Sequence, residues 1–207
     1  MHQLFIIPTL QKKGNQLFLP HIPDLLVQLR KVLRAKIGEH IFVQSLPSGH
    51  HGIIRYELKI THRTDEDLEG EIMNEQPLVE GIRSPITLLI AMPNKREKAE
   101  LVVQKLSEIG IDEILFRPAE RSIITTRNPK KAERLHKIAK EATEQSRGIR
   151  TPTIAWCEEV KKCCEGKELI VFDQTSEEES KEYFFRWKEH LSDKEMKAKC
   201  AIIGPEG

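Results

Sequence analysis

The alternation of apolar strands with amphipathic helices from residue 86 onward constrains the fold of this chain most strongly. Continuous apolar runs of strand length occupy residues 86–91, 169–172 and 200–203, and residues 113–116 and 153–155 have shorter ones. Helical periodicity occurs over residues 97–109, 130–146, 158–164 and 178–190, and Gly110 follows the first of these as a C-terminal cap. Strands that are apolar along their whole length belong to parallel sheets, whose faces are covered by crossover helices. We therefore expect a parallel α/β sheet that is buried on both faces.

The first part of the chain has a different pattern. Short strand-like runs occur at residues 4–7, 16–19, 41–44, 53–60 and 69–74, separated by turn residues, which is typical of a small barrel. One helix begins at Pro23 and ends before Gly38, and its apolar face consists of Leu25, Leu26, Leu29, Val32 and Leu33. Residues 75–81 are interpreted as a linker.

Charge is distributed unevenly, although the 33 basic and 32 acidic residues leave a net charge of only +1. Residues 1–81 carry −1, residues 82–150 carry +6 and residues 151–207 carry −4. A local basic field attracts phosphate backbones whatever the total charge. The alternative is a solvated helix face on which Glu133, Glu141 and Glu144 act as counterions.

Several protein classes are excluded by composition. The longest apolar run is far below the roughly 20 residues of a membrane-spanning helix, and the first eight residues do not resemble a signal peptide. The cysteines contain no C-x-x-C pair, so neither a zinc site nor a redox site is expected. We expect reduced packing thiols in a cytoplasmic protein; the four residues are Cys157, Cys163, Cys164 and Cys200.

Loops after the strands are where an α/β sheet binds its ligands. The loop at residues 92–95 has no glycine, which argues against a dinucleotide-binding cradle, and the chain has no P-loop. The loop Gly204-Pro205-Glu206-Gly207 has two glycines that permit close backbone approach and a carboxylate that accepts hydrogen bonds. Taken alone, these four residues are more typical of an ordinary strand-to-helix turn.

The end of the helix at residues 130–146 presents polar side chains. Glu141 and Gln145 lie one turn apart on the same face, and Arg147 follows at the helix terminus. One interpretation is a capped, charged helix end. The other is that the arginine and the glutamine are presented to an RNA phosphate or base.

Taken together in order and spacing, the motifs resemble the ribosomal RNA small subunit methyltransferase E family of the SPOUT superfamily. No single motif is decisive. The stretches that carry the resemblance are Val32-Leu33-Arg34 with Gly38, Lys95, Lys98, Glu100, Lys105-Leu106-Ser107-Glu108-Ile109-Gly110, Glu120-Arg121-Ser122, Glu141-Ala142, Gln145-Ser146-Arg147, Pro152 and Ile203-Gly204-Pro205-Glu206-Gly207.

This resemblance implies an α/β protein with two domains. Residues 1–75 would form a PUA-like RNA-binding barrel, and residues 82–207 a SPOUT-type parallel α/β domain with a trefoil knot. The protein would be a cytoplasmic homodimer without a membrane segment or a metal. It would use S-adenosylmethionine to methylate N3 of one uridine in 16S rRNA within the small ribosomal subunit.

The resemblance also implies where the methyl donor binds, and the chemistry of the reaction then gives candidate catalytic residues. The methyl donor would bind at Phe172, Gly204, Pro205, Glu206 and Gly207. Uridine N3 must lose a proton, for which Glu141 and Glu206 are candidate bases, and Arg147 would stabilise the anionic uracil. RNA would contact Arg34, Lys95, Lys98, Arg121 and Gln145.

The sequence departs from the family at three places. Gln28 replaces a common histidine, Gln3 replaces a common arginine, and the chain ends at Gly207, where the family continues into a second donor-binding loop. We therefore expect an incomplete SPOUT domain. Two alternatives remain: a non-catalytic RNA-binding or ribosome-assembly protein on the same scaffold, and a SPOUT methyltransferase with another RNA target.

Overall fold

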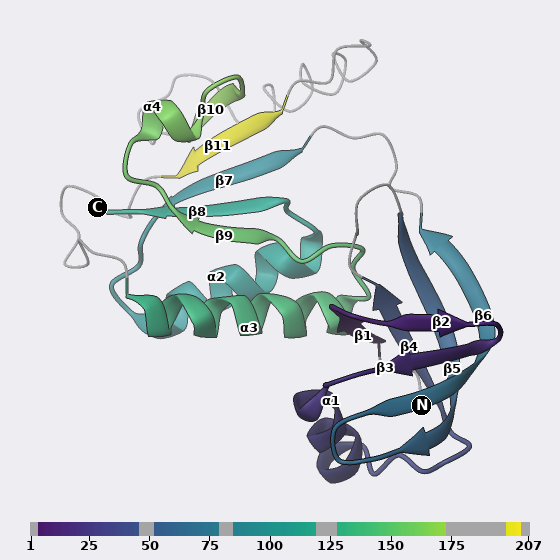
Figure 1. Cartoon of the computed structure of the whole chain (residues 1–207). Helices are drawn as coiled ribbons and strands as arrows, with labels where there is room; N and C mark the ends of the chain where they lie inside the picture. Colours follow the sequence, from purple (N-terminus) through teal and green to yellow (C-terminus); the bar gives the residue numbers. More distant parts are fainter. Residues whose placement is uncertain (1–3, 46–51, 79–84, 119–127, 173–197, 204–207) are drawn as a thin grey trace. The chain divides into compact units, whose positions relative to one another are not determined.

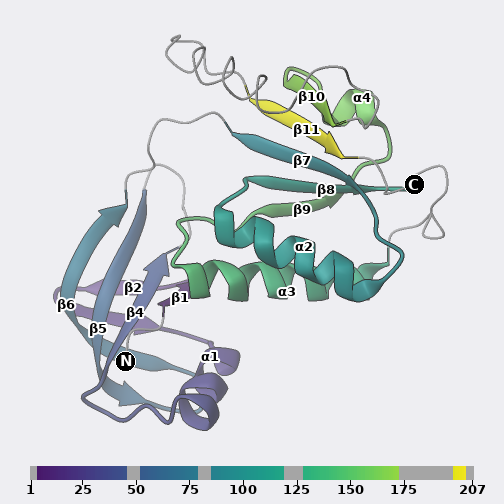
Figure 2. The same cartoon turned by 180° about the vertical axis from the view of Figure 1, so that it is seen from behind.

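The chain divides into two compact units, Met1–Glu80 and Gly81–Gly207. The structure is a computed structural model that describes residues 4–45, 52–78, 85–118, 128–172 and 198–203. Figures 1 and 2 show the elements of both units from opposite sides. No helix in these ranges is both long enough and apolar enough to span a membrane.

Unit 1 is built on a six-stranded sheet with the order β1-β4-β5-β6-β3-β2. Among its described strands, only β1 and β4 pair in parallel. Side chains that alternate along these strands point into one apolar core, which includes Leu17, Val43, Leu58 and Leu68. The strands are β1 (Leu4–Ile7), β2 (Gln11–Lys13), β3 (Gln16–Leu19), β4 (His40–Ser45), β5 (Ile53–Arg63) and β6 (Leu68–Leu78).

The helix of unit 1 begins at Pro23 as predicted, but its second half differs. Helix α1 (Pro23–Val27) continues as a wide π-helical segment, η1 (Gln28–Val32). The backbone N–H of Leu33 donates to the carbonyl of Gln28 across this wide turn. Because the wide turn breaks the helical period, Val32 is 70% exposed instead of lying on the apolar face.

The linker interpretation of residues 75–81 is wrong for its first half. Strand β6 extends to Leu78, and Ile54 pairs with Pro77. The neighbouring strand β3 pairs only with Leu68–Glu71 of β6, so the far end of β6 is an edge, where proline is tolerated.

Unit 2 contains the parallel sheet that the apolar runs predict. Its strand order is β10-β11-β7-β8-β9, and every neighbouring pair is parallel. The strands are β7 (Ile86–Ala91), β8 (Glu113–Arg117), β9 (Thr153–Trp156), β10 (Glu168–Phe172) and β11 (Lys199–Ile203).

Both faces of this sheet have apolar cores. Helices α2 (Arg96–Ile109) and α3 (Pro129–Ser146) cover one face, where Val103 and Leu135 pack with Ile114 (Figure 1). On the other face, Leu89 and Leu115 pack with cysteines next to the short helix α4 (Val160–Cys163). Gly110 caps α2 with φ of 81°, as predicted.

Strand β10 forms as predicted, but the expectation that it is buried is wrong. Leu169, Val171 and Phe172 are 43–62% exposed. Among the described strands β10 pairs only with β11, so it is an edge strand, and an apolar run alone does not distinguish an edge from a central strand. The helix predicted at residues 178–190 lies outside the described ranges.

Candidate functional site

Three strand ends lie side by side at the carboxyl edge of the parallel sheet. The pairing register aligns Phe172 with Ile203 and Ile203 with Ile90. Ligands of α/β sheets bind outside this edge. Phe172 is 43% exposed there among the described residues. Gly204 follows Ile203 directly in the sequence, although Gly204, Pro205, Glu206 and Gly207 lie outside the described residues.

The predicted catalytic residues lie at the other end of α3. Helix α3 starts on the carboxyl side of β8 and returns to the amino end of β9 (Figure 2). Its 18 residues span about 27 Å at 1.5 Å per residue. Glu141, Gln145 and Arg147 are exposed near its C-terminal end. Within one chain, the structure therefore does not bring Arg147 and Glu141 together with Phe172.

Arg147 has an unusual backbone conformation. It is the C-cap of α3, with φ 54° and ψ 36°, and its N–H donates to the carbonyls of Glu144 and Thr143. Glycine normally occupies such a left-handed position, as Gly110 does after α2. A side chain in this conformation costs about 1–2 kcal/mol. The strain falls on the residue that we expect, from its chemistry, to stabilise the anionic uracil.

The predicted RNA contacts are spread over both units. Lys95 is the N-cap residue of α2 and Lys98 lies in its first turn, and both are exposed. Arg34 in unit 1 is exposed and has a positive φ of 50°. Arg121 lies outside the described residues.

A basic cluster near Lys95 was not predicted as a unit. Glu100 of α2 accepts hydrogen bonds from Arg96 Nε at 2.6 Å and from Arg134 Nε of α3 at 2.5 Å. The hydrogen bond from Arg134 is the main reason that the pKa of Glu100 lies below its ordinary value. The i,i+4 spacing of Arg96 and Glu100 is visible in the sequence. The contact with Arg134 spans 34 residues and has no sequence signal.

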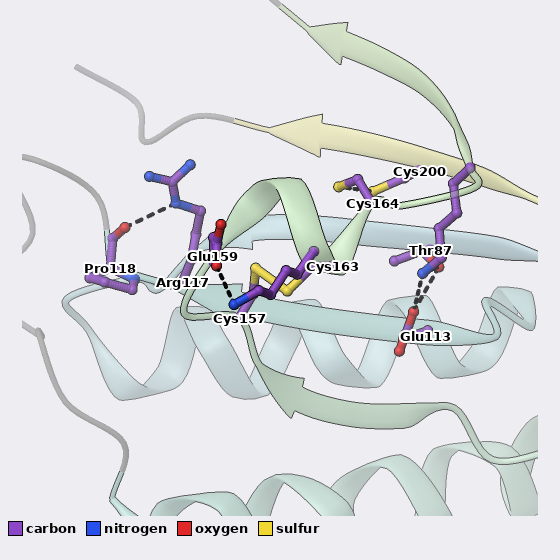
Figure 3. Close-up of a disulfide and its surroundings, with 11 residues drawn as sticks. Thr87, Glu113, Arg117, Pro118, Cys157, Glu159, Cys163, Cys164 and Cys200 are labelled. Atoms are coloured by element: carbon purple, nitrogen blue, oxygen red, sulfur yellow. Dashed lines mark hydrogen bonds and ion pairs between the residues drawn. A yellow bond between two sulfur atoms is a disulfide. The ribbon is translucent and has the colours of Figure 1, made fainter.

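The expectation of four reduced thiols is wrong. Cys157 and Cys163 form a disulfide, with their Cα atoms 6.3 Å apart (Figure 3). Cys157 directly follows β9 and Cys163 is the last residue of α4, so the turn between the two elements and the short helix bring the two cysteines together. The expectation rested on the small number of cysteines and on the absence of a C-x-x-C pair, and neither criterion detects one pair six residues apart.

The other two cysteines are buried thiols. Their Sγ atoms lie 3.2 Å apart, and burial raises the pKa of Cys200 to about 12 (Figure 3). The described part of the chain contains no group of three or more His, Cys, Asp or Glu side chains arranged to hold a metal ion.

Comparison with known proteins finds a family match over the whole of unit 2. A family model described as an RNA methyltransferase domain matches residues 81–207. Comparison with curated proteins finds no significant match.

Solved structures share the fold at low sequence identity. The ribosomal RNA small subunit methyltransferase E from Neisseria gonorrhoeae, bound to S-adenosylmethionine, has a TM-score of 0.73 and 19% identity. The match covers 100% of this chain and 81% of that one. A probable rRNA-methyltransferase from Porphyromonas gingivalis has a TM-score of 0.69 and 22% identity, covering 99% and 80% of the two chains. A Legionella pneumophila protein with bound S-adenosylmethionine has a TM-score of 0.74 and 20% identity, covering 100% and 81%.

Proposed function

Because this chain belongs to the RNA methyltransferase domain family, we propose that it methylates N3 of one uridine in 16S rRNA of the small ribosomal subunit, using S-adenosylmethionine. The observation that carries the proposal is the family match over residues 81–207. The shared fold of the Neisseria gonorrhoeae small subunit methyltransferase E supports the choice of RNA target.

The methyl donor would be held at the carboxyl edge of the parallel sheet. Phe172 would stack on the adenine, and the backbone of Gly204, Pro205, Glu206 and Gly207 would approach the donor closely. The aligned ends of β10, β11 and β7 and the partial exposure of Phe172 support this use. When bound, the donor supplies an electrophilic methyl group on a sulfonium.

The protein's own residues would prepare the uracil as the acceptor. The proton on N3 has to leave before or as the new bond to carbon forms, and a carboxylate, Glu141 or Glu206, would take it. The ring then carries negative charge on its oxygens. Arg147 would donate hydrogen bonds to one of these oxygens and stabilise that charge.

This division of roles calls for two copies of the chain. Arg147 lies about 27 Å along α3 from the end of the helix nearest the carboxyl edge, which keeps it away from Phe172, the described donor residue of its own copy. We therefore propose a cytoplasmic homodimer in which Arg147 of one copy acts at the donor loop of the other. Unit 1 would serve as a PUA-like RNA-binding domain, with Arg34 among its contacts.

Two measurements test the proposal. Calorimetry measures binding of S-adenosylmethionine to the protein, and transfer of a labelled methyl group to small ribosomal subunits, followed by nucleotide mapping, identifies the target. Arg147→Ala is expected to abolish transfer and retain donor binding. A protein that binds no donor, a label at another nucleotide, or unchanged turnover in the variant would each contradict the corresponding part.

A further inference from the structure

A small hollow lies between the N-terminal turns of α2 and α3, on the helix-covered face of the parallel sheet. Its apolar floor includes Ala99 and Leu135, and its walls include the side chains of Arg96, Glu100, Lys131 and Arg134. The volume is about 70 Å³, far below the roughly 300–1,000 Å³ of pockets for drug-sized ligands. The hollow therefore suits one small group, not a nucleoside.

Glu100 determines which of the guanidinium nitrogens remain available. Arg134 binds both carboxylate oxygens, with Nε 2.5 Å from Oε1 and a terminal nitrogen 3.1 Å from Oε2. Arg96 uses only its Nε, at 2.6 Å. Its two terminal nitrogens donate no hydrogen bond to a described residue, and 57% of its side chain is exposed.

The charge of the hollow selects an anion. Three cations, Arg96, Lys131 and Arg134, face one carboxylate, so the walls carry a net charge of +2. Lys131 is exposed, and its ammonium forms no ion pair with a described residue. Arginine terminal nitrogens and a lysine ammonium are the usual donors to phosphate oxygens.

We propose that this hollow binds one phosphodiester group of the substrate RNA, through the terminal nitrogens of Arg96 and the ammonium of Lys131. This inference rests on the proposed function, which makes RNA the partner. Lys95 and Lys130, both exposed at the first turns of α2 and α3, extend the basic surface beyond the hollow. A strand running over this surface would place its neighbouring phosphates near these lysines.

The test compares two variants that remove the same charge. Arg96→Gln/Lys131→Gln changes the hollow, and Lys161→Gln/Lys162→Gln changes two exposed lysines of α4, on the other face of the sheet. Binding of a single-stranded oligouridylate RNA is measured by fluorescence anisotropy over a range of salt concentrations. One lost phosphate contact makes the slope of log K against log[salt] less negative by about 0.7.

We expect this change of slope, with roughly tenfold weaker binding at low salt, in the hollow variant only. Unchanged affinity and slope, or an equal loss in the α4 variant, would overturn the proposal. If the double variant does not fold, Lys131→Gln against Lys161→Gln gives the same comparison, because both side chains are exposed.

Donor binding and methyl transfer separate this proposal from the function. If the wild type transfers no methyl group while the hollow variant loses RNA binding, only the proposed function is contradicted. If the wild type transfers methyl groups normally while the hollow variant binds RNA fully, only the phosphate site in the hollow is contradicted.

Discussion

Replacing Arg147 with glycine is expected to stabilise the protein relative to Arg147→Ala, while both variants lose methyl transfer. Arg147 has φ 54° at the C-cap of α3. Glycine removes a strain of about 1–2 kcal/mol. The greater conformational freedom of glycine in the unfolded chain lowers stability by about 0.4–1 kcal/mol. The free energy of unfolding of Arg147→Gly is therefore expected to be about 0.5–1 kcal/mol higher than that of Arg147→Ala.

Comparing the glycine and alanine variants removes a complication. Both lose every contact of the arginine side chain, so the difference between them reports the backbone alone. Urea unfolding followed by circular dichroism measures it, and the thermal midpoint is expected to differ by roughly 1–4 °C for a chain of this size.

Gly110→Ala is the matched control. Gly110 caps α2 with φ 81°, and a Cβ built there meets no atom within 4 Å, so only backbone strain is introduced. This variant is expected to lose about 0.5–1 kcal/mol by the same arithmetic.

The reasoning is refuted if Arg147→Gly is less stable than Arg147→Ala while Gly110→Ala shows its expected loss. Retained methyl transfer in Arg147→Ala would instead refute the role of the side chain. The two results are independent, because one concerns unfolding and the other turnover.

Three further predictions follow from the site. When the protein is denatured without reduction, two thiols should react, and four reactive thiols would contradict the disulfide. Reducing the disulfide should lower the free energy of unfolding by about 2 kcal/mol, the loop-closure value for a ring of this size. Because the folded-state pKa of Glu100 is lowered, its contribution to stability is present above the ordinary value of 4.5 and is lost as pH falls through the folded-state pKa. Glu100→Gln should therefore unfold more easily than wild type at pH 7 and equally easily in strong acid; equal stability at pH 7 would argue against the pairing. When Arg147→Ala is mixed with an equal amount of a variant that binds no donor, half of the dimers contain one copy of each. If the site is shared between copies, one of the two sites in each mixed dimer is intact, so about a quarter of wild-type transfer should return. If the site is not shared, no transfer should return.

Much of the fold of unit 2 could be predicted because its signals are local. The apolar run at Ile86–Ala91 has the same bounds in the sequence and in the structure. The helical periods that end at Ile109 and Ser146 are likewise confirmed. Such patterns reflect which side of a strand or helix is buried, and neighbouring residues are sufficient to reveal them.

Exposure at the sheet edges could not be predicted in this way. Strand β10 has the composition of a central strand, yet among the described strands β11 is its one neighbour, and Val171 is 62% exposed. The number of neighbours of a strand depends on the sheet order, and that order is not encoded in any single segment.

The sequence by itself determined the element types, the basic character of residues 82–150 and the resemblance to RNA methyltransferases. Only the tertiary structure decided which of these residues meet. It paired Glu100 with Arg134 and joined Cys157 to Cys163, and it separated Arg147 from Phe172 within one chain. The physical reason is that local patterns record burial within one element. A site, in contrast, is made by contacts between elements, whose partners are chosen by packing.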